Sequence, residues 1–223
     1  MTQKNCSCNR WERQHTKMEE FMNILTHGIG IGIAIAGLVL LVIFASIVGD
    51  TWAIVSSAIF GFTMILLYVS STFCHVTTGK KFEKFFEICD NLAIYYLIAG
   101  TYTPYTLTIL RGPVGWITFG CIWGLAIAGT FLKFKYKDNQ PKWTVLLYLF
   151  MGWFLIFIFN KLYNALTPMG FNFLLAGGFS YTIGILFYLW RKLKFSHAIW
   201  HLFVLNGTIM FFFSVLFGCI LLR

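Results

Sequence analysis

Two pairs of side chains in this sequence have the types and spacing of metal ligands. Ser71 and His75 lie four residues apart, and so do His197 and His201. Residues four apart share one face of a helix, so both members of a pair can point the same way. Asp90 adds a carboxylate at the start of another apolar segment. These five residues are the first candidates for chemistry.

Three histidines and a carboxylate are what a catalytic zinc site needs, because neutral imidazoles bind zinc well and a fourth position can stay open to water. We expect His75, His197 and His201 to bind zinc. We expect Asp90 to be either the fourth ligand or the base that holds the water. Water bound to zinc ionises near neutral pH and can attack an amide or ester carbonyl. Ser71 would donate to the developing oxyanion or orient the water.

A further polar stripe precedes and enters the first apolar segment. Glu20, Asn23 and His27 recur there at helical spacing, and we expect them to contact the metal ligands without binding the metal themselves. A simpler alternative is that the histidines only form hydrogen bonds between helices, or that a fully coordinated metal ties the helices together. Cys74 and Cys89 adjoin the candidate ligands, but adjacent helical side chains point about 100° apart. We expect these two cysteines to pack.

The composition places these residues in a membrane protein. Hydrophobic residues make up 58% of the chain and charged residues 11%, whereas about 25% is usual for charged residues in soluble domains. Uncharged runs such as 24–48 are long enough to cross a bilayer as helices. The net charge of +9 does not predict nucleic-acid binding, because the basic residues lie between apolar runs.

Seven apolar segments predict an all-α integral membrane protein, a seven-transmembrane helical bundle. Residues 1–20 are expected to form a short cytoplasmic tail, and 21–223 a single membrane domain. The expected segments are 24–48, 52–73, 88–108, 113–132, 143–160, 166–190 and 196–222.

The basic residues predict the orientation of these segments. Arg111, Lys161 and Arg223 flank one set of segment ends, and the other 14 of the 17 Lys and Arg residues flank the opposite set. By the positive-inside rule the amino terminus is cytoplasmic and the carboxyl terminus lies outside. This orientation brings the five candidate residues to one depth, at the cytoplasmic ends of the second, third and seventh segments.

A stripe of small residues lies in the first segment. Gly28, Gly32 and Ala36 recur every four residues, and such a stripe lets a neighbouring helix approach closely. We expect this face to pack against another helix.

The chain resembles the haemolysin III family, bacterial relatives of the progestin and adiponectin receptors. Three blocks carry the resemblance. They are EFMNILTHG at 20–28, STFCH at 71–75 with Asp90 leading into IAGTYTP at 98–104, and HAIWHLFV at 197–204.

The resemblance carries roles onto particular residues. In the receptor branch the matching histidines are zinc ligands and the aspartate holds or shares the zinc-bound water, which implies these roles for His75, His197, His201 and Asp90. It also implies a multi-pass protein of the bacterial inner membrane whose partners are membrane lipids.

Two positions depart from the family pattern. Relatives usually have histidine where this chain has Asn91 and Met210, so any proton-relay role of those histidines is not expected here. Asn206 stands where a small apolar residue is usual, and we expect it to form a hydrogen bond between helices.

Three functions fit these observations. The first is a zinc-dependent lipid hydrolase acting on an amide, as in a ceramide-like lipid, because the receptors and the alkaline ceramidases resemble one zinc-bearing superfamily. The second is a non-catalytic membrane sensor or homeostasis protein with a structural metal. The third is a pore-forming cytolysin, which the gathering of polar residues at one end disfavours.

Overall fold

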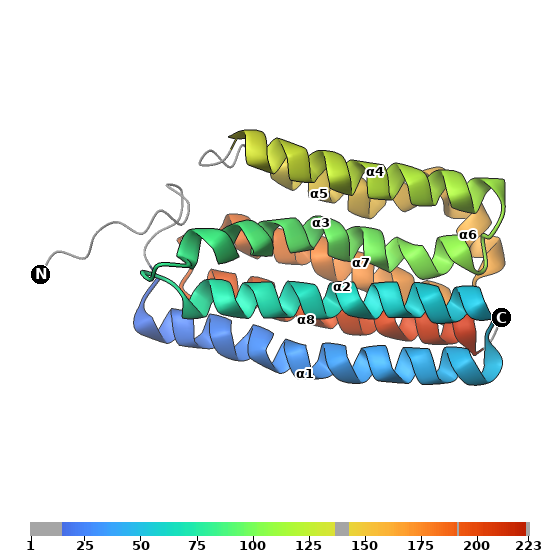
Figure 1. Cartoon of the computed structure of the whole chain (residues 1–223), viewed down its shortest axis with the longest axis horizontal. Helices are drawn as coiled ribbons and strands as arrows, with labels where there is room; N and C mark the ends of the chain where they lie inside the picture. Colours follow the sequence, from blue (N-terminus) through green and yellow to red (C-terminus); the bar gives the residue numbers. More distant parts are fainter. Residues whose placement is uncertain (1–14, 137–142, 191, 222–223) are drawn as a thin grey trace, which may run out of the picture.

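The computed structural model describes residues 15–136, 143–190 and 192–221, and throughout this part of the chain the regular structure is helical (Figure 1). The prediction of an all-α protein is confirmed. The helices are α1 Lys17–Val48, α2 Thr51–Val76, α3 Glu83–Leu107, α4 Pro113–Tyr136, α5 Trp143–Gly152, α6 Phe159–Ala165, α7 Pro168–Leu189 and α8 Ser196–Val215. A 3₁₀ stretch, η1 Trp153–Ile158, joins α5 to α6, and a π-helical turn, η2 Leu216–Ile220, continues α8.

Six helices in the described part of the chain are long and apolar enough to cross a membrane, counting α5, η1 and α6 as one and α8 with η2 as another. The remaining long helix, α3, is less apolar because it begins with Glu83, Lys84, Glu87 and Asp90. Its second half is nevertheless enclosed, since every residue from Leu97 to Leu107 is buried. A helix buried on all sides belongs to the interior of the bundle.

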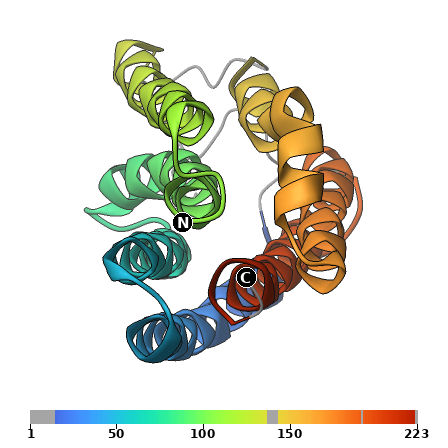
Figure 2. The same cartoon turned by 90° about the vertical axis from the view of Figure 1, so that its right-hand side faces the viewer.

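The helices form a ring when the bundle is viewed along its axis (Figure 2). Helix α1 packs on α2, α2 on α3, α3 on α4 and α7 on α8. The ring closes where α8 packs against α1, so the first and last helices are neighbours. This closure brings α1, α2 and α8 together.

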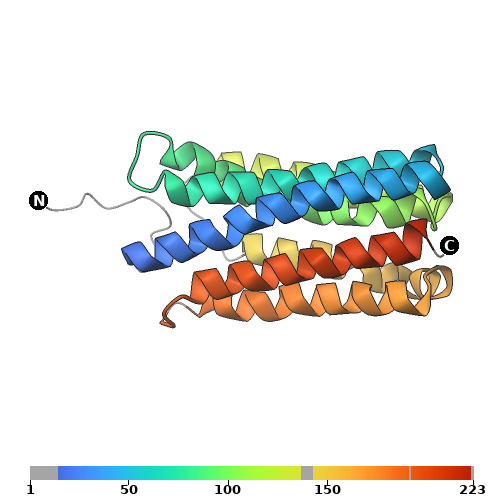
Figure 3. The same ribbon diagram turned by 90° about the horizontal axis from the view of Figure 1, so that it is seen from below.

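Short connections place the candidate residues at one end of this ring. The start of α1, the turn from α2 to α3 and the start of α8 lie at the same end (Figures 1 and 3). We call this the amino end, the end marked by Lys17, Val76 and Ser196. The first helix, α1, begins at the amino end, and the last element, η2, finishes at the opposite end (Figure 3).

The predicted packing stripe of α1, formed by Gly28, Gly32 and Ala36, lies on the wrong face of the helix. A Cβ added at Gly28 or Gly32 would meet no atom within 4 Å, and Ala36 is exposed. The close approach occurs instead at Gly30, where a Cβ would overlap the Tyr68 ring of α2. The small residue that matters is therefore two positions away from the predicted stripe.

Candidate metal centre

His75, His197 and His201 converge at the amino end of the bundle. One ring nitrogen from each lies within 4.8 Å of those of the other two, and the described residues contain no other such group of three His, Cys, Asp or Glu. The ring centres are 5.1 Å apart for His75 and His197, 5.2 Å for His75 and His201, and 4.5 Å for His197 and His201. Two imidazoles on one tetrahedral zinc, each at about 2.0–2.1 Å, have ring centres about 5 Å apart. The spacing therefore fits a shared metal.

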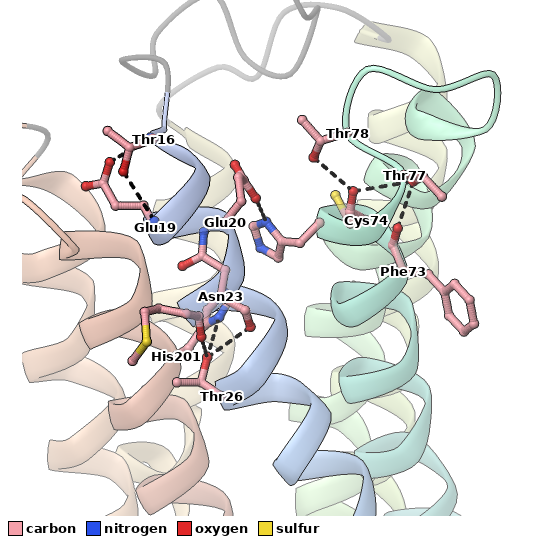
Figure 4. A network of polar contacts seen from close by, with 12 residues as sticks. Thr16, Glu19, Glu20, Asn23, Thr26, Phe73, Cys74, Thr77, Thr78 and His201 are labelled. Atoms are coloured by element: carbon pink, nitrogen blue, oxygen red, sulfur yellow. Dashed lines mark hydrogen bonds and ion pairs between the residues drawn. The ribbon is translucent and has the colours of Figure 1, made fainter.

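Glu20 fixes the orientation of the His75 ring. Its carboxylate reaches from α1 and accepts a hydrogen bond from His75 Nδ1 at 2.8 Å (Figure 4). The other nitrogen, Nε2, is buried and has no hydrogen-bond partner among the residues that the structure describes. Metal-binding histidines usually donate their second N–H to a carboxylate or carbonyl in this way. The hydrogen bond leaves Nε2 as the nitrogen of His75 that could bind a metal.

Thr26, which like Glu20 belongs to α1, contacts His201 of α8. The Thr26 hydroxyl lies 3.2 Å from His201 Nδ1, and it donates to the backbone carbonyls of Met22 and Asn23 at 2.9 and 3.0 Å (Figure 4). Because the hydroxyl proton is directed at those carbonyls, its oxygen accepts from His201 Nδ1. Nε2 of His201 is then available to a metal. Thr26 was missed from the sequence, although it lies three residues after Asn23 and immediately before His27.

Asn23 and His27 lie at the site without bonding the three histidines through their side chains. Asn23 is fully buried, and its side-chain amide has no partner. The His27 ring stacks on His201 with ring centres 3.5 Å apart and meets the edge of Tyr68 at 5.2 Å. Neither nitrogen of His27 has a hydrogen-bond partner.

All five histidines of the chain belong to this cluster. The fifth is His15, whose ring centre is 5.6 Å from that of His197. It precedes the first apolar segment, and for that reason sequence analysis did not select it. Its position is fixed by the next residue, because Thr16 caps α1 in a capping box with Glu19.

Glu19 joins the start of α1 to the start of α8. Its buried carboxylate accepts from the backbone N–H of Phe195 at 2.8 Å and of Thr16 at 2.9 Å. Phe195 has φ +59°, a left-handed conformation that is unfavourable for a bulky residue. The carboxylate thus holds the turn that leads directly into His197. Glu19 was missed from the sequence, although Thr16 and Glu19 have the spacing of a capping box.

Asp90 lies beside the histidines rather than among them. It is absent from the close group of three, but it lines the same cavity from α3 and is half-buried. Ser71, one turn before His75 on α2, lines the same cavity as Asp90. The two predicted catalytic residues are therefore brought together.

A cavity of about 160 Å³ opens next to these groups. Its polar lining includes Ser71, His75, Asp90 and His201, and its remaining walls from α3, α5, α7 and α8 are mostly apolar. A second cavity, of about 40 Å³, has five lining residues in common with the first cavity. The shared residues are Ile98, Gly152, Leu155, Tyr181 and Phe211. Polar groups at one end and apolar walls beyond suit an amphipathic ligand.

The remaining expectations concern neighbouring side chains. Cys74 is buried and Cys89 half-buried, and neither belongs to the close group of three histidines. Asn206 of α8 donates to the Ser180 hydroxyl of α7 at 3.1 Å, which confirms the predicted interhelical hydrogen bond. Asn91 lines the cavity and donates to the Glu87 carbonyl at 2.6 Å.

This fold and site define a multi-pass helical membrane protein with a histidine cluster at one end of its bundle. The sequence model of the family described as Haemolysin-III related matches residues 15–212. The chain belongs to this family, as the three sequence blocks predicted.

Several proteins share most of the length of the chain. It is 49% identical to Hemolysin-3 of Bacillus cereus over 199 residues, covering 89% of this chain and 91% of that protein. It is 46% identical to the Hemolysin-3 homolog of Bacillus subtilis (strain 168) over 205 residues, covering 92% and 96%. Monocyte to macrophage differentiation factor of Homo sapiens is 30% identical over 206 residues, covering 90% and 84%.

Proposed function

We propose that this protein is a zinc-dependent hydrolase that cleaves an amide bond of a membrane lipid. The observation that carries the proposal is the convergence of His75, His197 and His201 at the polar end of an otherwise apolar cavity. A metal site that faces such a cavity is placed to act on a lipid. A metal that only tied helices together would not need a cavity.

The donor set suits zinc. Three neutral imidazoles with a nearby carboxylate match the ligands that catalytic zinc sites use. A buried Nε2 without a partner, as in His75, carries a desolvation penalty that a bound metal would remove. His75, His197 and His201 would hold the ion, with Asp90 as a fourth ligand or as a base. When bound, zinc polarises water and the carbonyl oxygen of the substrate.

The residues of the chain supply the proton transfers. Water adds to the carbonyl carbon, and the Asp90 carboxylate accepts the proton that it releases. The carbon–nitrogen bond then breaks, Asp90 returns the proton to the departing amine, and the products are a fatty acid and an amine. Ser71, which lines the same cavity, would orient the water or donate to the developing oxyanion.

The proposal includes a position in the membrane. We propose that α3 is the seventh span, that the amino end is cytoplasmic and that the protein resides in the bacterial inner membrane. Residues 1–20 would form the cytoplasmic tail, and 21–223 the membrane domain. Lysines near the amino end support this orientation by the positive-inside rule. In the described part of the chain they include Lys80, Lys81, Lys133, Lys135, Lys192 and Lys194, against Arg111 and Lys161 at the opposite end.

The decisive measurement compares metal content and lipid cleavage in the same samples. Purified wild type should contain about one zinc per chain and release fatty acid from an N-acyl lipid. His201→Ala should lose most of the zinc and the activity, because a buried ligand with a fixed orientation is removed. Asp90→Asn should keep most of the zinc if Asp90 acts as the base, and lose cleavage by at least about 100-fold.

Cys74→Ala is the matched control, because Cys74 lines the cavity but lies outside the histidine group. It should keep both zinc and activity. Wild type without zinc would contradict the metal site. Fully zinc-loaded wild type that cleaves no amide lipid would contradict the hydrolase and favour a structural metal.

A further inference from the structure

Two side chains of α1 have buried polar atoms that form no hydrogen bond with the described residues. They are Asn23 and His27, one helical turn apart, and the four atoms are Oδ1 and Nδ2 of Asn23 and Nδ1 and Nε2 of His27. Asn23 is fully buried, and His27 is 3% exposed. A buried polar group without a hydrogen bond is destabilising, and in native proteins such groups are rare. Two adjacent residues of this kind indicate a site that takes a polar partner.

His27 faces the cavity, where it is distinct from the three candidate ligands. It lines the cavity together with His75, His197 and His201, but it is not part of their close group. Its ring lies nearly parallel to that of His201, at an interplanar angle of 16°, and Tyr68 packs against it. Packing thus fixes the plane of the His27 ring, and its nitrogens remain available to a molecule in the cavity.

We propose that His27, the one of these two residues that lines the cavity, is a neutral hydrogen-bonding site that receives the uncharged amide or hydroxyl group of the lipid substrate. The inference rests on the proposed function and narrows it to a substrate class. A neutral imidazole offers one donor and one acceptor, which matches an amide or a hydroxyl. The lipid chain would extend from this point along the apolar walls.

The charges around the cavity argue against a phosphate head group. No Lys or Arg lines the cavity in the described part of the chain, and its charged lining residues are Glu87 and Asp90. Phosphate groups are usually held by Arg, Lys or backbone N–H groups at a helix start. No Lys or Arg side chain of the described lining is therefore placed to hold a phosphate. An uncharged head group fits the same lining.

The test uses zinc-loaded protein and two probes with the same chain, N-dodecylacetamide and dodecyl phosphate, with binding measured by native mass spectrometry. Wild type should bind the acetamide more tightly than the phosphate. His27→Leu should weaken acetamide binding by about tenfold, because a buried hydrogen bond is lost, and should leave the zinc content unchanged. His27→Gln keeps a donor and an acceptor and should retain most of the affinity.

Tyr181→Phe is the matched control, because Tyr181 also lines the cavity but its hydroxyl is already paired with Thr208 at 2.8 Å. It should change acetamide binding by less than about twofold. Equal acetamide binding by wild type and His27→Leu would overturn the inference, and so would a preference of the wild type for the phosphate. Zinc loss in both folded His27 variants would also overturn it, since His27 would then be a ligand.

The outcome for this site is separable from that for the proposed function. If wild type prefers the acetamide through His27 but cleaves no lipid, the binding site stands and the hydrolase proposal fails. If wild type cleaves amide lipids and His27→Leu cleaves and binds them equally well, the hydrolase stands and the binding site fails.

Discussion

At the scale of single residues, the hydrogen bond between Glu20 and His75 determines how this imidazole can bind a metal. It occupies Nδ1 and leaves Nε2 as the free nitrogen. Glu20→Ala removes the acceptor, so the ring can rotate and either nitrogen can carry the proton. We expect zinc affinity to fall by about 10- to 100-fold, the usual effect of removing a residue that orients a ligand.

Competition with a chromophoric chelator measures this change in zinc affinity. Glu83→Ala is the control, because the Glu83 carboxylate lies at the same end of the bundle and accepts from the Gly79 N–H rather than from a histidine. Its zinc affinity should equal that of wild type. Equal zinc affinity in Glu20→Ala and wild type would show that the Glu20 contact does not orient His75.

At the scale of helices, the approach of α1 to α2 depends on one missing side chain. Gly30→Ala places a methyl group against the Tyr68 ring, whereas Gly28→Ala places one in open space. We expect Gly30→Ala to destabilise the protein by about 1–3 kcal/mol through overpacking. Gly28→Ala should be neutral or stabilising by up to about 1 kcal/mol, because alanine favours helix more than glycine. Thermal unfolding in detergent measures both, and equal melting temperatures would contradict the packing.

The same helix illustrates what the sequence could predict and what it could not. Hydropathy located α1 and its end at Val48, because apolar length alone defines a span. It did not define which face packs, since Gly28 and Gly30 are equally small and only the bulk of Tyr68 across the interface distinguishes them. Rotation about a helix axis is decided by the neighbouring helix, and a single sequence does not name that neighbour.

The candidate site, too, could be predicted from the sequence only in part. The spacing of His197 and His201 identified a shared face, and the order of the apolar segments brought His75 to the same end. The contacts from α1 were harder to predict. Glu19 binds the backbone N–H of Phe195 and Thr26 contacts a nitrogen of His201, and both contacts form only because α1 lies against α8. That closure of the ring is a property of the tertiary fold.

At the scale of the whole molecule, the two ends of the bundle differ in charge and in chemistry. The amino end carries the histidine cluster and many lysines, while the opposite end has an ion pair between Arg111 and Asp50 at 3.2 Å. Helix α1 starts at one end and η2 finishes at the other (Figure 3). If the amino end is cytoplasmic, any product released from the cavity at this end enters the cytoplasm or the inner leaflet.

This orientation predicts the outcome of reporter fusions. Alkaline phosphatase, which is active only outside the cytoplasm, should be active when fused after Arg223 and inactive when inserted at Gly79, in the exposed turn from α2 to α3. A fluorescent protein that folds only in the cytoplasm should give the reverse pattern. The turn from α2 to α3 and the end of η2 lie at opposite ends of the same bundle, so each fusion serves as the control for the other. A carboxyl-terminal reporter active only in the cytoplasm would mean that the chain crosses the membrane an even number of times. One of the seven long helices would then not span the bilayer. Helix α3 would be the first candidate, because it begins with polar residues.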